Sequence, residues 1–230
     1  MNPALENVWK NMLALGVGSL AHANCHAAYS DMGHGRWPVP ERWSDLSVLQ
    51  AGHAAEIFIK ARIAQEHPLL IFDQFPRSTK SLGSELDVVD LFKSGRTVQW
   101  SDLPERLWAT TGIKLPNLER YDSFGKLRNG LQHFGPTQGL DTGGETLKFV
   151  FEVIDPFINQ CWGLFAVDFD ENTEEYNYFT GTLVSREILF LVSPDAASEY
   201  ENWEADWSEV SDDYRIEMQR RVKTRLAEKV

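Results

Sequence analysis

Apolar residues recur at three- and four-residue intervals over long segments of this chain, and that spacing constrains its fold more than any other feature. Between Ser44 and about Glu66, the recurring positions are Leu46, Leu49, Ala54, Ile57, Ala61 and Ala64. This interval places side chains on one face of an α-helix, and Ser44 is a suitable N-cap residue for it. The pattern predicts a helix that buries one face.

Similar patterns predict that most of the chain is helical. Helices are expected over residues 4–30, 84–94, 101–111, 117–134 and 145–167, the last of them kinked at Pro156. Residues 32–40 contain two glycines and two prolines, which predict a loop. Residues 176–192 are ambiguous, because residues 176–184 favour a strand whereas residues 186–192 fit a strand or a helix, so the chain is expected to be all-α with at most a minor β pair there.

Composition and charge limit the classes of function. The chain has 230 residues, 43% of them hydrophobic, and its two cysteines, Cys25 and Cys161, lack the spacing of a disulfide framework. No segment approaches the roughly 20 apolar residues that span a bilayer. We therefore expect a soluble, cytoplasmic protein without membrane contact. A net charge of −12 argues against a general basic surface, so any nucleic-acid contact must use a local cluster of cations.

The C-terminal segment changes in composition from residue 194. Nine acidic residues lie between Asp195 and Glu217, and four basic residues follow between Arg220 and Arg225. An apolar stripe there consists of Tyr200, Trp203, Trp207 and Val210. Acids early and bases late suit a helix dipole, which favours a docked C-terminal helix pair. The alternative is an acidic surface that mimics nucleic acid or meets a partner.

The segment 121–134 carries the best candidate site. On a helical projection, one apolar face consists of Tyr121, Phe124, Leu127, Leu131 and Phe134, and we expect it in the core. Beside this face, four polar residues span an arc of roughly 140°, namely Arg128, Asn129, Gln132 and His133. The simplest interpretation is a solvated helix face, with His133 favourable near a helix C-terminus. Gly130 argues against it, because a mid-helix glycine usually indicates a close neighbour.

The residues of this arc carry a family resemblance. Arg128-Asn129-x-x-x-His133 resembles the Arg-polar-x-x-x-His signature of HEPN domains, helical bundles found in prokaryotic toxins, anti-phage defence proteins and CRISPR-associated ribonucleases. Residues 52–61 are similar to the second helix of that family, an apolar stretch carrying Glu56 and then Lys60. The resemblance covers roughly residues 1–167. It implies a HEPN-like up-and-down bundle over 1–170. Residues 171–230 lie outside the resemblance and are expected to form an acidic and aromatic extension packed on the bundle.

The resemblance also implies an activity. HEPN domains are metal-independent endoribonucleases that act as homodimers, so the expected reaction is RNA cleavage to 2′,3′-cyclic phosphate ends, without metal or cofactor. The implied catalytic residues are Arg128 and His133, with Asn129 orienting His133 or binding the substrate. The expected supporting residues are Lys126, Gln132, Glu56 and Lys60, with Glu56 fixing either Arg128 or Lys60. Some relatives carry a tyrosine two residues after the histidine, where this chain has Gly135, which argues against regulation by modification of that tyrosine.

The expected partners are RNA, a second copy of the chain, and an antitoxin or defence-system protein. The expected role is that of a toxin or anti-phage defence effector. A different class of function stays open, in which the bundle is a non-catalytic dimerisation or sensing module of such a complex.

Other motifs are weaker. His22 and His26 lie one helical turn apart without a third fixed ligand, and Gly143-Gly144 is too short to indicate a phosphate loop.

Overall fold

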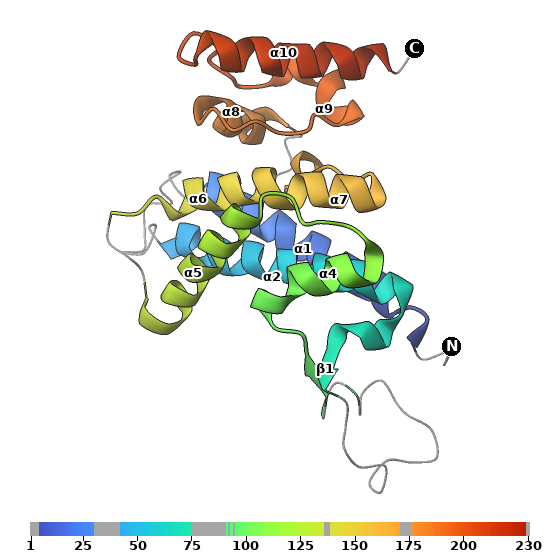
Figure 1. Cartoon of the computed structure of the whole chain (residues 1–230). Coiled ribbons are helices and arrows are strands. Elements are labelled where there is room, and N and C mark those ends of the chain that lie inside the picture. The colour runs from blue at the N-terminus through green and yellow to red at the C-terminus, as the bar shows by residue number, and fades with distance from the viewer. Residues whose placement is uncertain are drawn as a thin grey trace, which may run out of the picture. The chain divides into compact units, whose positions relative to one another are not determined.

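The computed structural model describes residues 5–29, 42–74, 95–135, 139–170 and 176–228, together with Leu91 and Lys93. Its α-helices are α1 (Val8–Ala28), α2 (Arg42–Glu66), α4 (Leu103–Thr111), α5 (Leu118–Phe134), α6 (Thr142–Phe149), α7 (Asp155–Trp162), α8 (Asn177–Ser185), α9 (Pro194–Ser198) and α10 (Asp212–Ala227) (Figure 1). The π-helical turn η4 (Val150–Ile154) joins α6 to α7, and the 3-10 turns are η2 (Pro68–Ile71), η3 (Trp100–Asp102), η5 (Ala166–Asp168) and η6 (Tyr200–Asn202). The two strands are β1 (Phe72–Gln74) and β2 (Arg96–Thr97). The predicted all-α class with one small β pair is confirmed.

The chain forms two compact units. The first consists of residues 1–16 and 55–115, and the second of residues 17–54 and 116–230. Helices α1 and α2 therefore each contribute residues to both units. The boundary expected at residue 170 falls inside the second unit.

The core of the first unit is built around the second half of α2. Phe58 is fully buried, and a Cβ added at Gly16 of α1 would lie 2.8 Å from its ring. Gly16 therefore lets α1 pass close to that ring. From α4, Leu103 and Leu107 are also fully buried. Strands β1 and β2 pair antiparallel, with Phe72 opposite Thr97.

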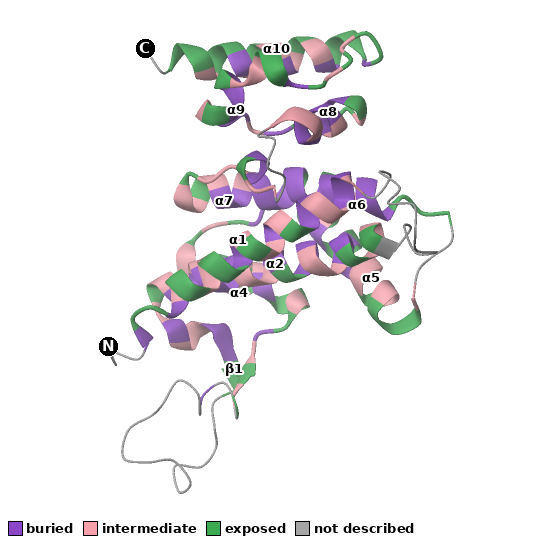
Figure 2. Cartoon of the chain, turned by 180° about the vertical axis from the view of Figure 1, so that it is seen from behind, coloured by how far each residue is buried: buried purple, intermediate pink, exposed green. Residues whose placement is uncertain are grey.

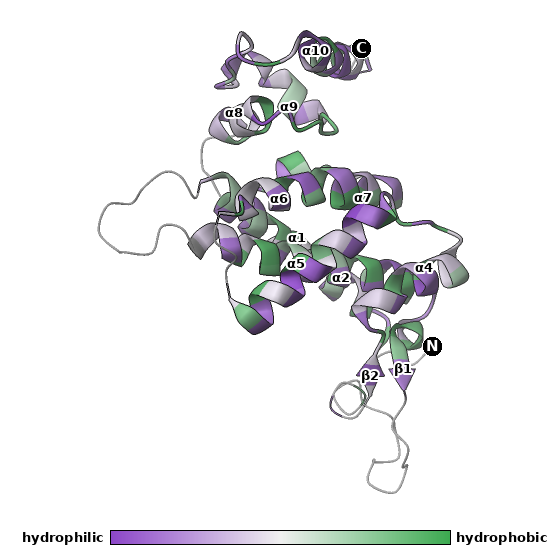
Figure 3. Ribbon diagram, turned by 60° about the vertical axis from the view of Figure 1, so that its left-hand side comes forward, coloured by the Kyte–Doolittle hydropathy of each residue, from purple (hydrophilic) through white to green (hydrophobic). Residues whose placement is uncertain are grey.

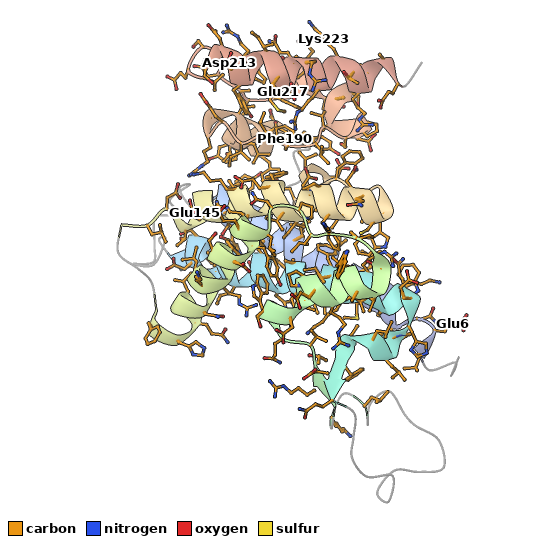
Figure 4. All side chains as sticks on the ribbon, viewed as in Figure 1. Glu6, Glu145, Phe190, Asp213, Glu217 and Lys223 are labelled. Atoms are coloured by element: carbon orange, nitrogen blue, oxygen red, sulfur yellow. The ribbon has the colours of Figure 1, made fainter. Side chains whose placement is uncertain are left out.

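The core of the second unit is rich in aromatic rings. Phe124 of α5 stacks on Phe149 of α6 with ring centroids 3.8 Å apart and planes 2° from parallel. Phe151 of η4 contacts the rings of Phe179 in α8 and Phe190 beyond it. Phe190 lies between the α6–α7 layer and the helices above it (Figure 4). These rings hold α5 to α6 and the C-terminal segment to η4.

Two buried polar side chains fix the backbone after α7. Asp155 accepts hydrogen bonds from the amides of Ala166 at 2.8 Å and Leu191 at 2.9 Å. Asn24 of α1 donates to the carbonyls of Ala166 at 3.1 Å and Phe169 at 2.8 Å. Of these four bonds, the one from Leu191 crosses residue 170 and connects the segment before α9 to α7.

Helix α10 covers α8 and α9 in the second unit (Figures 1 and 2). Its buried residues are Tyr214, Met218 and Val222. Basic side chains of α10 donate to the extended segment before α9, with Arg221 bound to the carbonyl of Phe190 at 2.7 Å and Arg225 to that of Val192 at 2.9 Å. The rest of α10 is largely hydrophilic (Figure 3). Part of the C-terminal basic run is therefore used for packing.

Several local expectations are corrected. Helix α2 begins at Arg42, so Ser44 lies within its first turn, where its hydroxyl accepts a hydrogen bond from Thr142 instead of capping the helix. The β pair near 176–192 is wrong, because residues 177–185 form α8 and the described strands lie in the first unit. The apolar stripe of the C-terminal segment is largely outside helices, with Trp203 and Val210 buried in the stretch before α10. The loop 32–40 and nearly all of the helix 84–94 lie outside the described residues.

The other expected helices are confirmed. Residues 4–30 correspond to α1, residues 101–111 to η3 and α4, and residues 117–134 to α5. The expected kink at Pro156 corresponds to a change of helix type, because η4 ends just before α7, where Pro156 occupies the first turn. A proline has no N–H to donate, so the regular hydrogen bonding of the preceding helical turn ends there.

Among the described helices, none combines the length and apolar character needed to cross a membrane.

Candidate functional site

The N-terminal half of α5 is anchored in the second unit. Asn117 precedes the helix in a left-handed conformation, φ 44°, and its side chain accepts from the amide of Arg120 at 3.2 Å. Arg120 forms an ion pair with Glu145 of α6 at 2.8 Å. Tyr121 and Phe124 are buried against α6 and η4. This half of the helix is therefore a rigid base for the C-terminal half.

The C-terminal half of α5 carries the predicted polar arc and is open to solvent (Figure 2). Of the predicted site residues on this helix, four are exposed, namely Lys126, Asn129, Gln132 and His133. Arg128 is half-buried. The helix ends at Gly135, whose φ of 82° is accessible mainly to glycine. The arc is thus presented on a fixed helix end.

The aliphatic part of Arg128 lies against the backbone of α2. A Cβ added at Gly52 would be 2.6 Å from Cδ of Arg128 and 3.3 Å from its Cγ. Only a glycine at residue 52 leaves room for the arginine in this position. This contact was not predicted from the sequence, although a glycine within the long helix predicted over 44–66 was a signal for a close neighbour.

The guanidinium of Arg128 is bound to its neighbour on the arc. Its Nη2 donates to Oδ1 of Asn129, with nitrogen and oxygen 3.3 Å apart. Asn129 was expected to orient His133, but among the described residues no hydrogen bond joins these two side chains. The side chain of Asn129 is bound to Arg128 instead. The His133 ring faces that of Phe134, with centroids 6.4 Å apart and planes at 67°.

The pair predicted on α2 forms within the first unit. Lys60 donates to Glu56 at 2.6 Å and to the hydroxyl of Thr97 in β2 at 3.0 Å. Lys60 is buried and Glu56 is half-buried. Of the two contacts expected for Glu56, the structure has the one with Lys60. The bond from Lys60 to Thr97 then connects α2 to β2. Glu56 and Lys60 belong to the first unit, and the polar arc of α5 to the second.

Two expectations for the candidate helix are wrong. Phe134, placed on the buried stripe, is 91% exposed because the helix has left the core by its last turn. Gly130, expected to mark a close neighbour, has nothing within 4 Å of an added Cβ. The glycine that admits a neighbour is Gly52, on the partner helix of Arg128.

Weaker motifs have structural roles or remain without a ligand set. His26 shares a hydrogen bond of 2.7 Å with Gln50, and within the described part of the chain no three His, Cys, Asp or Glu side chains group to hold a metal. At the start of α6, the side chain of Asp141 accepts from the amide of Gly144 at 2.8 Å. Because this carboxylate occupies the helix N-terminus, Gly143-Gly144 serves close packing and not anion binding.

The site therefore presents one guanidinium and one imidazole from a single exposed helix face. A guanidinium binds phosphate oxygens through paired N–H donors, and an imidazole can take or give a proton near neutral pH. No known protein family, curated protein or solved structure matches the chain in comparison. The chemistry open to this site therefore follows from its own residues.

Proposed function

We propose that this protein is a metal-independent endoribonuclease of the HEPN type that cleaves RNA as a homodimer, in the role of a toxin or anti-phage defence effector. The observation that carries the proposal is the joint presentation of Arg128 and His133 on the exposed end of α5. The base of that helix is fixed by aromatic stacking, and the arginine stem is held against Gly52. Pre-positioned cationic groups stabilise a developing charge without reorganisation.

The reaction needs few groups. A base removes the proton of a ribose 2′-OH, and the resulting oxyanion attacks the adjacent phosphorus. The bond from phosphorus to the 5′-oxygen breaks, and an acid protonates that leaving oxygen. The products are a 2′,3′-cyclic phosphate and a 5′-hydroxyl. Arg128 binds the non-bridging oxygens, on which negative charge accumulates in the transition state.

A second copy of the chain completes the catalytic set. One imidazole serves as base or as acid, and both are needed in the same turnover. Two chains related by a twofold axis bring two copies of His133 and two of Arg128 to one phosphate. Asn129 and Gln132 of the arc, together with the exposed Lys126, then line the groove that receives the RNA.

The test is cleavage of a labelled RNA by the purified protein in the presence of EDTA, with chemical analysis of the new ends. The wild type is expected to produce 2′,3′-cyclic phosphate ends, and His133→Ala to lose them. His22→Ala is the matched control, because His22 is a helical histidine of α1 and not part of the polar arc of α5. Unchanged cleavage by His133→Ala would reject the role of that residue, and intact RNA with the wild type would reject the nuclease.

One observation favours the non-catalytic alternative, a dimerisation or sensing module within a defence or toxin–antitoxin complex. Among the described residues, no hydrogen bond orients the His133 ring, whereas catalytic imidazoles are usually held by a partner group. Under this alternative the two chains associate through α5 without cutting RNA. Dimers that leave every tested RNA intact in EDTA, and also in Mg²⁺, would support it.

A further inference from the structure

Phe134 is the most exposed of the large hydrophobic side chains in the described part of the chain. It is 91% exposed at the last position of α5, directly after His133. The two rings meet edge to face, 6.4 Å apart between centroids, and the exposure of Phe134 leaves a ring face open to solvent. Gly135 follows as the C-cap of the helix, with a φ of 82°.

Apart from the half-buried Leu131, the described residues next to this ring on α5 are polar or glycine. On the preceding turn, Gln132 and His133 are exposed, and Gly130 offers open space in place of a side chain. A stable protein interface requires roughly 800 Å² from each partner and an apolar centre. One phenyl ring among polar groups does not form such a centre, whereas a single aromatic face is sufficient to stack one nucleobase.

The charge of the chain strengthens this interpretation. With a net charge of −12, the protein repels a polyanion at long range, so few phosphate contacts are available to hold it. Base stacking contributes binding energy that does not depend on counterion release. An acidic nuclease therefore needs a contact of this kind beside its small set of cations.

We propose that Phe134 is a base-stacking residue that places one nucleotide of the RNA against His133. This inference rests on the proposed function in taking RNA as the ligand. A base on the open face of Phe134 brings the ribose of the same nucleotide toward the adjacent imidazole, which then accepts the 2′-OH proton. The ring thereby selects which phosphodiester is cut, and it requires that nucleotide to be free of pairing.

Binding is measured in the His133→Ala background, in which the RNA is not consumed. The probe is a fluorescent single-stranded RNA oligonucleotide of mixed sequence. Phe134→Leu is expected to weaken binding by about tenfold or more, because leucine keeps the apolar volume and loses the stacking face. Phe134→Tyr keeps that face and is expected to bind within about twofold of the parent. Leu118→Ala is the control, since Leu118 is 49% exposed at the opposite end of α5.

The outcomes separate this inference from the proposed function. Equal binding by Phe134→Leu and the parent would overturn the stacking role while leaving the nuclease intact. A dimer that dissociates in Phe134→Leu during sedimentation would also overturn it, since the ring would then be a contact between protein chains. Binding that depends on the aromatic ring, in a protein whose wild type leaves RNA uncut in EDTA, would support stacking and reject catalysis.

Discussion

The side chain of Arg128 in α5 lies against α2 at Gly52, where a Cβ added to the glycine would be 2.6 Å from Cδ of the arginine. This contact connects the two segments on which the family resemblance is based, the signature on α5 and the stretch that begins at residue 52. The glycine has no catalytic group of its own. Its role is to let a half-buried arginine present its guanidinium beside Asn129.

Gly52→Ala is expected to reduce RNA cleavage by about tenfold or more, because the new methyl group displaces the stem of Arg128 and a misplaced catalytic group loses much of its effect. Cleavage rates and thermal unfolding are measured together. The control is Gly18→Ala, a helical position in α1 where an added Cβ meets nothing within 4 Å. Full activity in Gly52→Ala would mean that the guanidinium can act from another position.

Asp155 is expected to make stability depend on pH. Burial raises its pKa to about 7, against the opposing effect of hydrogen bonds from the amides of Ala166 and Leu191. A raised pKa in the folded state means that the folded protein binds the extra proton, so this contribution to stability is present at low pH and is lost as pH rises through about 7. Between pH 8 and pH 6 it should grow by about 1 kcal/mol.

The measurement for Asp155 is denaturant unfolding of the wild type and Asp155→Asn at several pH values. The variant cannot titrate at this position, so the difference in unfolding free energy should shift in favour of the wild type as pH falls. The variant should be less stable throughout by about 1–3 kcal/mol, because its amide accepts only one of the two backbone N–H groups. A difference that is constant with pH would show that Asp155 does not titrate in this range.

Glu56 is expected to matter for stability through Lys60. Glu56→Gln leaves the nearly buried ammonium of Lys60 without its anionic partner and should cost about 1–3 kcal/mol of unfolding free energy. Glu66→Gln is a matched control on the same helix, since Arg62–Glu66 is also an i,i+4 pair but its glutamate is 46% exposed. That control should cost at most about 1 kcal/mol. Equal effects from the two variants would contradict a special role for the buried pair.

The helical framework was accessible from sequence because periodicity reports which face of a segment is apolar. For this reason the bounds of α1, α4 and α5 were predicted closely. Residues 176–192 were misjudged because β-branched and aromatic residues fit a buried helix as well as a strand. Phe179, Leu183 and Val184 pack as the buried face of α8. Strand β2, of only two residues, depends on tertiary contacts such as that between Thr97 and Lys60.

The candidate site was predictable in part. Helical spacing correctly placed Arg128, Asn129, Gln132 and His133 on one side of α5, since that depends only on the geometry of the helix. It did not show where the helix leaves the core, so Phe134 was assigned to the buried stripe. It also could not show which glycine admits a neighbour, because Gly52 and Arg128 are 76 positions apart in the sequence. Such distant contacts are set by packing and not by local pattern.

A mixed dimer decides whether His133 from two chains acts at one phosphate. Differently tagged wild-type and His133→Ala chains are co-expressed, and the dimer carrying both tags is isolated and assayed for RNA cleavage in EDTA. A composite site needs both imidazoles, so the mixed dimer should cleave at least about tenfold more slowly than the wild-type dimer. Cleavage at half of the wild-type rate would show that each chain works alone and would contradict the shared site.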